Sequence, residues 1–104
     1  MDKTIDFPKK KELIEELRKN NIIFAAIFGS RAKETASNDS DYDLLVEFDP
    51  KKDVDVFEFT EIKDSLEKTL QSQVDLVTIY GLGSQSFRKE VLNTMKVLYG
   101  TRKV

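Results

Sequence analysis

The sequence predicts an α/β fold in which a small mixed β-sheet packs against helices. Two patterns predict this class: apolar runs of strand length, and apolar residues that recur every three to four positions, as on one face of a helix. The patterns alternate in the order α-β-(turn)-β-α-β-α, which a layered α/β arrangement accommodates. The 104 residues show no repeat and no linker, so residues 1–104 are expected to form one domain around a single core.

The first half of the chain is expected to contain one helix and two strands. Pro8 suits the first turn of a helix because proline has no backbone N–H to leave unpaired. This helix has the apolar stripe Leu13, Ile14 and Leu17 and ends at Asn20-Asn21. The apolar run over 22–28 is bounded by Gly29, as expected for a buried strand of a covered sheet. The other expected elements are one helical turn over 31–34, a loop through 37–40 and a strand over 41–48.

The second half of the chain is expected to contain a long helix, a strand and a last helix. A helix over 54–71 is predicted by the spacing of Val56, Phe59, Ile62, Leu66 and Leu70. A third strand over 74–79 is β-branched and apolar apart from Asp75. Ser84 is a candidate cap for a helix with the stripe Phe87, Val91 and Met95, and we interpret these stripes as core. Residues 96–99 fit either a short edge strand or the end of that helix.

Composition excludes several function classes. The chain has 17 basic and 19 acidic residues and a net charge of −2, so it has no global basic field and no strong intrinsic binding of nucleic acid is expected. Cysteine and histidine are both absent, which removes thiolate zinc sites and histidine-dependent nucleophilic catalysis. The longest apolar run, 22–28, is far short of the ~20 residues that cross a bilayer. No membrane association is expected, and the default location is cytoplasmic.

The first candidate chemistry lies around Gly29. Ser30 stands where a helix would begin, so its hydroxyl and the neighbouring backbone N–H groups could bind an anion. Ten residues later come Asp41 and Asp43, whose spacing of two puts both carboxylates on one face of a strand, about 7 Å apart along the chain. The opposite face holds the apolar residues Leu44, Val46 and Phe48. A phosphate cradle followed by a carboxylate pair suggests a metal–nucleotide site.

Asp75 is the second candidate, because a charge in an apolar strand is costly unless something pairs with it. If its strand lies beside the strand of Asp41 and Asp43, the three carboxylates share one face. Such carboxylates repel one another unless a divalent cation lies among them, and hard oxygen ligands select Mg²⁺ or Mn²⁺. Taken alone, each feature has a simpler explanation: a capped corner at Ser30, an exposed strand start at Asp41, or a lysine partner for Asp75. Their joint occurrence in this order favours the site.

In this order the residues resemble a known superfamily. The motifs are Phe28-Gly29-Ser30-Arg31-Ala32, then Ser40-Asp41-x-Asp43-Leu44-Leu45-Val46, and later Val74-Asp75-Leu76-Val77. They are similar to those of the DNA polymerase β nucleotidyltransferases, and the short length and preceding helix narrow the resemblance to the minimal nucleotidyltransferases (MNT). The resemblance spans about 13–99 and implies a polymerase β palm-like fold.

The resemblance also implies a role for each site residue. Gly29 and Ser30 would bind the triphosphate of a nucleoside triphosphate, with ATP as the expected donor. Asp41 and Asp43 would ligate two Mg²⁺ ions, with Mn²⁺ as the alternative, and Asp75 would complete the metal shell and help deprotonate the attacking hydroxyl. From position alone, Arg31 and Lys33 could neutralise phosphate charge. Family members commonly have glycine at the position of Glu34, so the loop entering the site is expected to differ here, with an effect on catalytic efficiency and nucleotide choice more than on the reaction class.

The same resemblance implies a partner and an activity. Many minimal nucleotidyltransferases work beside a small helical protein of the HEPN class, and some act as antitoxins by transferring AMP to a tyrosine of that partner. The expected function is therefore Mg²⁺-dependent transfer of AMP from ATP to a protein hydroxyl. Two alternatives remain open: a non-catalytic antitoxin-like module that masks its partner, and an RNA 3′-end nucleotidyltransferase that uses a partner subunit to bind RNA.

Overall fold

A computed structural model of the chain describes residues 5–33, 41–78 and 81–101. Within these residues the elements follow in the order α1 (Lys10–Lys19), β1 (Ile22–Phe28), β2 (Tyr42–Phe48), α2 (Val56–Leu70), β3 (Val74–Thr78), α3 (Gln85–Thr94) and β4 (Lys96–Tyr99). The strands form one mixed sheet in the order β3-β2-β1-β4, in which β1 is antiparallel to β2 and β4 and β2 is parallel to β3. The predicted α/β fold with a small mixed sheet is confirmed.

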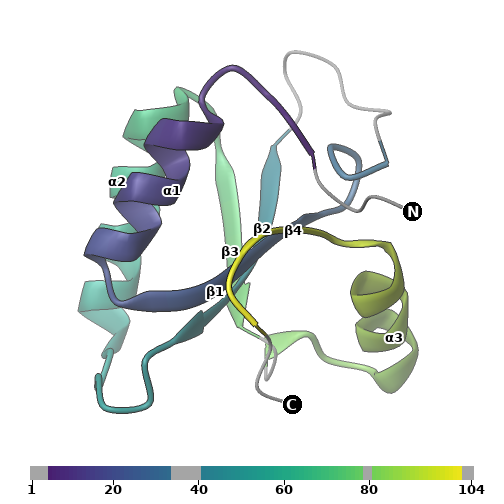
Figure 1. Ribbon diagram of the computed structural model, residues 1–104. Coiled ribbons are helices and arrows are strands. Elements are labelled where there is room, and N and C mark those ends of the chain that lie inside the picture. The colour runs from purple at the N-terminus through teal and green to yellow at the C-terminus, as the bar shows by residue number, and fades with distance from the viewer. Residues whose placement is uncertain (1–4, 34–40, 79–80, 102–104) are drawn as a thin grey trace.

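Helices cover both faces of the sheet. Helices α1 and α2 lie side by side on one face, and α3 lies on the other (Figure 1). The core under α1 and α2 includes the buried residues Leu13, Leu17, Ile27, Leu44, Val46, Leu66 and Leu76. The core under α3 is smaller and includes Phe24, Ala26, Phe28, Leu45, Leu82 and Val91. Because side chains alternate along a strand, β2 contributes Leu44 and Val46 to the first core and Leu45 to the second.

Within the described residues, the predicted helices and strands agree with the observed ones to within a few residues, and the predicted loop over 37–40 lies outside them. The strand over 22–28 is confirmed, and residues 96–99 form an edge strand that pairs with β1. Ser84 caps α3, since its hydroxyl accepts a hydrogen bond from the Phe87 N–H at 3.3 Å. Strand β2 begins at Tyr42, one residue after Asp41. No helix in the described part of the chain is long and apolar enough to cross a membrane.

Two residues of the predicted core stripes are exposed instead. Val56 is 77% exposed because it is the first residue of α2, directly after the cap Asp55, and contact with the core begins one turn later at Phe59. Phe87 is 44% exposed and lies at the edge of the smaller core. Helical spacing defines the apolar side of a helix but not how far along the helix the sheet extends beneath it. The interpretation of these two side chains as core was therefore wrong.

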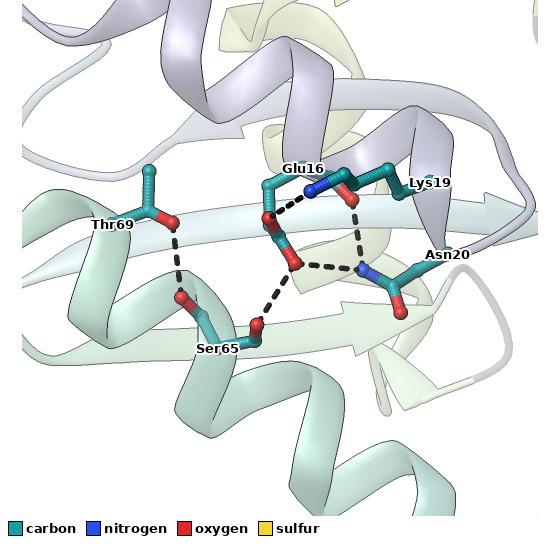
Figure 2. A network of polar contacts seen from close by, with 5 residues as sticks. All are labelled: Glu16, Lys19, Asn20, Ser65 and Thr69. Carbon is teal, nitrogen blue, oxygen red and sulfur yellow. Dashed lines mark hydrogen bonds and ion pairs between the residues drawn. The ribbon is translucent and has the colours of Figure 1, made fainter.

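A polar network joins α1 to α2 above the larger core (Figure 2). One carboxylate oxygen of Glu16 accepts hydrogen bonds from the Ser65 hydroxyl at 2.8 Å and from Asn20 Nδ2 at 3.4 Å. Its other oxygen lies 3.7 Å from Lys19 Nζ. Asn20 Nδ2 also donates to the Glu16 carbonyl at 2.8 Å, at the C-terminal end of α1. The bond between Glu16 and Ser65 joins α1 to α2, and these two helices form the layer that covers this face of the sheet.

Parallel strands need a long crossover, and α2 provides it between β2 and β3. Glu67 of α2 accepts the Val74 N–H at 2.9 Å and Lys63 Nζ at 3.1 Å. At the same end of the sheet, the Tyr42 N–H donates to the Gln73 carbonyl at 2.9 Å. The start of β3 is thus held both by its crossover helix and by β2, and this sets the register of the two strands.

Candidate active site

The turn after β1 brings the backbone close to a carboxylate of β2. Gly29 has φ +74°, in the left-handed region that favours glycine. A Cβ at this position would overlap Asp43 Oδ2, so a side chain there would displace the carboxylate. The Lys33 N–H donates to the Gly29 carbonyl at 3.2 Å, which closes a single turn over the segment where one helical turn was predicted. The corner is therefore shaped around Asp43.

Asp43 and Asp75 are register partners on the parallel strands β2 and β3. Neighbouring strands lie about 4.8 Å apart, so these two residues are adjacent on the face that α3 covers. Asp43 is half-buried and Asp75 is exposed. Burial raises the pKa of the Asp43 carboxyl above its ordinary value, and the negative charges of Asp75 and then Asp41 raise it further. The structure thus confirms that Asp75 lies beside the strand of Asp43.

These residues line a cleft of about 280 Å³ between the sheet and α3. It is lined by Phe28, Gly29, Lys33, Asp43, Asp75, Phe87, Glu90, Val91 and Thr94. Sequence reasoning missed the contribution of α3, namely Phe87, Glu90 and Thr94. Their spacing of three and four residues was the available signal, because it puts an aromatic, a carboxylate and a hydroxyl on one side of the helix.

Not every predicted site residue reaches this cleft. Gly29, Lys33, Asp43 and Asp75 line it together, with Ser30 next to Gly29 in the turn. Asp41 is exposed just before β2 and acts on Asp43 through its charge. The Arg31 guanidinium lies 3.8 Å from the centroid of the Tyr42 ring, and Tyr42 belongs to the core on the opposite face. Residue 34, the position that departs from the family pattern, lies outside the described residues.

The charge of the cleft suits a cation. Three carboxylates, Asp43, Asp75 and Glu90, line it against one lysine, Lys33. Burial of Asp43, and after it the negative charges of Asp75 and Asp41, raise the pKa of the Asp43 carboxyl. The donors present are the hard oxygens that Mg²⁺ and Mn²⁺ prefer. Across the described ranges, no group of three acidic side chains is already gathered as a metal-binding cluster. The donor set fits a divalent cation, and within it Asp43 and Asp75 are the adjacent pair.

A glycine–serine corner beside paired carboxylates on a mixed sheet is the arrangement that the resemblance to nucleotidyltransferases implied. The sequence matches the family described as "Polymerase beta, Nucleotidyltransferase" over residues 11–103. The chain therefore belongs to this family of nucleotidyltransferases, and the resemblance to its minimal members is confirmed by the solved structures below.

Relatives and solved structures agree with this assignment. A Methanocaldococcus jannaschii protein named "Putative protein adenylyltransferase MJ1379" is 32% identical over 83 residues, which cover 80% of this chain and 81% of that protein. A crystal structure of a toxin–antitoxin with AMP-PNP matches at 28% identity and a TM-score of 0.74, covering 90% of this chain and 75% of the other. A structure of a tri-AMPylated Shewanella oneidensis HEPN toxin with its MNT antitoxin matches at 26% identity and a TM-score of 0.67, covering 89% and 71%.

Proposed function

We propose that this nucleotidyltransferase transfers AMP from ATP to a tyrosine hydroxyl of a HEPN-type partner, in a Mg²⁺-dependent reaction, and so acts as an antitoxin. The relative named as an adenylyltransferase supports AMP as the group and protein as the acceptor. The structural similarity to an MNT antitoxin bound to an AMPylated HEPN toxin supports the partner. The single observation on which the proposal depends is the pairing of Asp43 with Asp75 beside Gly29 in one cleft.

The corner at Gly29 and Ser30 is the part of the cleft suited to phosphate. Gly29 lets the backbone turn sharply at the end of β1, so that N–H groups of the turn can approach a triphosphate without an intervening side chain. Lys33 adds a positive charge at the same edge of the cleft. In this proposal the turn holds the triphosphate and fixes the α-phosphate next to the carboxylates.

The carboxylates then serve the transfer itself. Asp75 accepts the proton of the attacking tyrosine hydroxyl, and the proton passes to solvent. A bond forms between the hydroxyl oxygen and the α-phosphorus, the bond from that phosphorus to the oxygen shared with the β-phosphate breaks, and pyrophosphate leaves. Asp43 and Asp75, with Asp41, would hold Mg²⁺, which when bound neutralises charge on the phosphate oxygens. Asp43 keeps its place because Gly29 leaves room for its carboxylate.

The proposal is tested with ATP labelled at the α-phosphate. The purified chain, Mg²⁺ and a lysate of the source cells are incubated together, and protein and RNA are separated before label is measured. Two variants are run beside the wild type: Asp43→Asn, and the matched control Asp64→Asn. Asp64 is an exposed aspartate of α2 that does not line the cleft. Label on one small protein band with the wild type and the control, but not with Asp43→Asn, is the expected result.

Other outcomes would overturn the proposal in identifiable ways. Label on RNA would favour the RNA 3′-end nucleotidyltransferase. Absence of label, together with absence of ATP binding in a direct titration, would leave the masking module. A pull-down with Asp43→Asn separates masking from catalysis: if the variant still binds the partner but no longer protects cells from it, catalysis is needed for protection.

A further inference from the structure

One wall of the cleft has no part in the mechanism above. Phe87, Glu90 and Thr94 line the cleft from one side of α3, and together they are called the α3 wall. This wall belongs to the same cleft as Asp43 and Asp75, which come from the sheet. A nucleotide whose phosphates lie at the Gly29 turn would therefore extend its remaining part within reach of α3.

Phe87 is an unusual side chain to leave in contact with solvent. It is 44% exposed, although most large apolar side chains of the described chain are buried. Its ring packs edge-to-face against the buried Phe28, with centroids 6.4 Å apart and an interplanar angle of 78°. This contact holds the ring in place at the cleft. A fixed, exposed aromatic ring is a stacking platform for a flat heterocycle.

The polar groups of the α3 wall accept hydrogen bonds. The Glu90 carboxylate can only accept when ionised, and the residue is exposed. The Thr94 hydroxyl donates its hydrogen to the Glu90 carbonyl at 2.8 Å, so the lone pairs of that oxygen remain for accepting. An exocyclic amine can satisfy such groups, whereas a keto oxygen at the same place would meet another acceptor.

We infer that the α3 wall binds the nucleobase of the donor nucleotide and selects bases with an exocyclic amine over their keto counterparts. This inference rests on the proposed function and specifies the substrate of that site. The alternative occupant is the aromatic ring of the acceptor tyrosine. That ring has one hydrogen-bond donor, its hydroxyl, which must lie at Asp75 to react, so it would leave Glu90 without a donor. A nucleobase presents both a π-face to Phe87 and an amine to Glu90.

The test compares ATP with inosine triphosphate, whose base has a keto group in place of the amine and an N1–H in place of the bare ring nitrogen. Binding of each to the purified chain is measured by calorimetry with Mg²⁺, and inorganic triphosphate serves as the base-free probe. The wild type should bind ATP about tenfold more tightly than inosine triphosphate, since one charge-assisted hydrogen bond is at stake. Glu90→Gln should bring this ratio close to one, because an amide can donate as well as accept.

Phe87→Leu removes the ring but keeps an apolar side chain. It should weaken ATP and inosine triphosphate alike, by about tenfold, and leave inorganic triphosphate unchanged. Asn93→Ala is the matched control, since Asn93 is an exposed residue of the same helix that does not line the cleft. It should alter none of these affinities.

The possible failures are distinguishable. If neither ATP nor inorganic triphosphate binds the wild type, the proposed function itself fails. If ATP binds but Glu90→Gln leaves the ratio unchanged and Phe87→Leu leaves both affinities unchanged, the inference is overturned and the proposed function stands. If Phe87→Leu leaves nucleotide affinity intact but abolishes labelling of the partner protein, the α3 wall receives the acceptor, and the inference is again overturned.

Discussion

The carboxylate of Asp43 occupies the space that a Cβ at position 29 would need. Gly29→Ala should therefore slow transfer strongly, mainly by pushing that carboxylate out of place. A misplacement of about 1 Å can reduce a rate by roughly 100-fold, and a loss of this size is expected in the labelling assay. The left-handed backbone at position 29 adds a stability cost of about 1–2 kcal/mol, measurable by urea denaturation.

Gly83→Ala provides the control for Gly29→Ala. Gly83 has φ +79°, and a Cβ there would meet nothing within 4 Å. The two substitutions should cost a similar free energy of unfolding, because the Asp43 side chain can rotate away from an alanine at position 29. Only the first should lose activity. Labelling by Gly29→Ala within a few-fold of the wild type would contradict the role assigned to this contact.

Asp43→Asn should stabilise the metal-free protein while it abolishes transfer. The pKa of Asp43 is raised from 3.8, so the fold favours the protonated form of this carboxyl over the ionised form. The stability that the protonated form contributes is lost as the pH rises through the raised value. Because Asp43 is only half-buried and solvent screens its charge, the expected gain at neutral pH is only about 0.5 kcal/mol, or roughly 2–4 °C in melting temperature. Thermal denaturation without metal measures this gain in stability.

Saturating Mg²⁺ should stabilise the wild type more than the Asp43→Asn variant, and equal stabilisation would count against Asp43 as a ligand.

Glu67→Gln should weaken the fold at neutral pH but not in acid. Hydrogen bonds from the Val74 N–H and from Lys63 lower the pKa of the Glu67 carboxyl below 4.5. A lowered pKa means that the ionised group contributes stability above pH 4.5, and that this contribution is lost as the pH falls through the folded value. The melting temperatures of wild type and variant should converge below pH 4.5. A difference that is constant between pH 7 and pH 3 would show that the carboxylate does not hold the start of β3.

Tyr99→Phe should reduce stability without reducing transfer. The Tyr99 hydroxyl donates to the Ile22 carbonyl, and burial raises the pKa of Tyr99 to about 12, against a smaller opposite effect of Arg18. Loss of the hydrogen bond should cost about 1 kcal/mol, or roughly 4–8 °C in melting temperature. Tyr99 also adds stability that is lost as the pH rises from 10.0 towards 12, so the variant should be less sensitive to alkali over this range. If Tyr99→Phe is folded but gives less labelled protein, Tyr99 itself would be an acceptor of AMP.

Much of the fold and part of the site were predictable because the signals are local. The strand over 22–28 is a continuous apolar run bounded by Gly29, and the Ser84 cap depends on a residue three positions away. The adjacency of Asp43 and Asp75 is not local. It depends on the parallel pairing of β2 with β3, whereas the sequence analysis treats the adjacency of these strands only as a condition, and no spacing in the sequence could show it.

The features that could not be predicted from the sequence depend on which residues lie opposite each element in the folded chain. Phe87 has the spacing of a core residue, and its exposure is decided by the edge of the sheet under α3. Arg31 follows the phosphate corner directly, yet its guanidinium lies on Tyr42 at the other face of the sheet. Glu90 shares a helical spacing with Phe87 and Thr94, but only the cleft shows that this side of α3 faces Asp43 and Asp75. Side-chain direction at a turn, and the depth of burial along a helix, are tertiary properties.

Strand β3 is paired on one side only in the described sheet, with β2. An edge strand with open backbone groups is a template for a strand of another chain, and short length and charge are the common protections against it. Strand β3 has five residues, and Asp75 is exposed between the buried residues Val74 and Leu76. The same carboxylate that faces the cleft therefore also guards the edge of the sheet against aggregation. A variant neutral at position 75 is expected to lose colloidal stability along with activity, so its self-association should be followed by light scattering before its inactivity is interpreted.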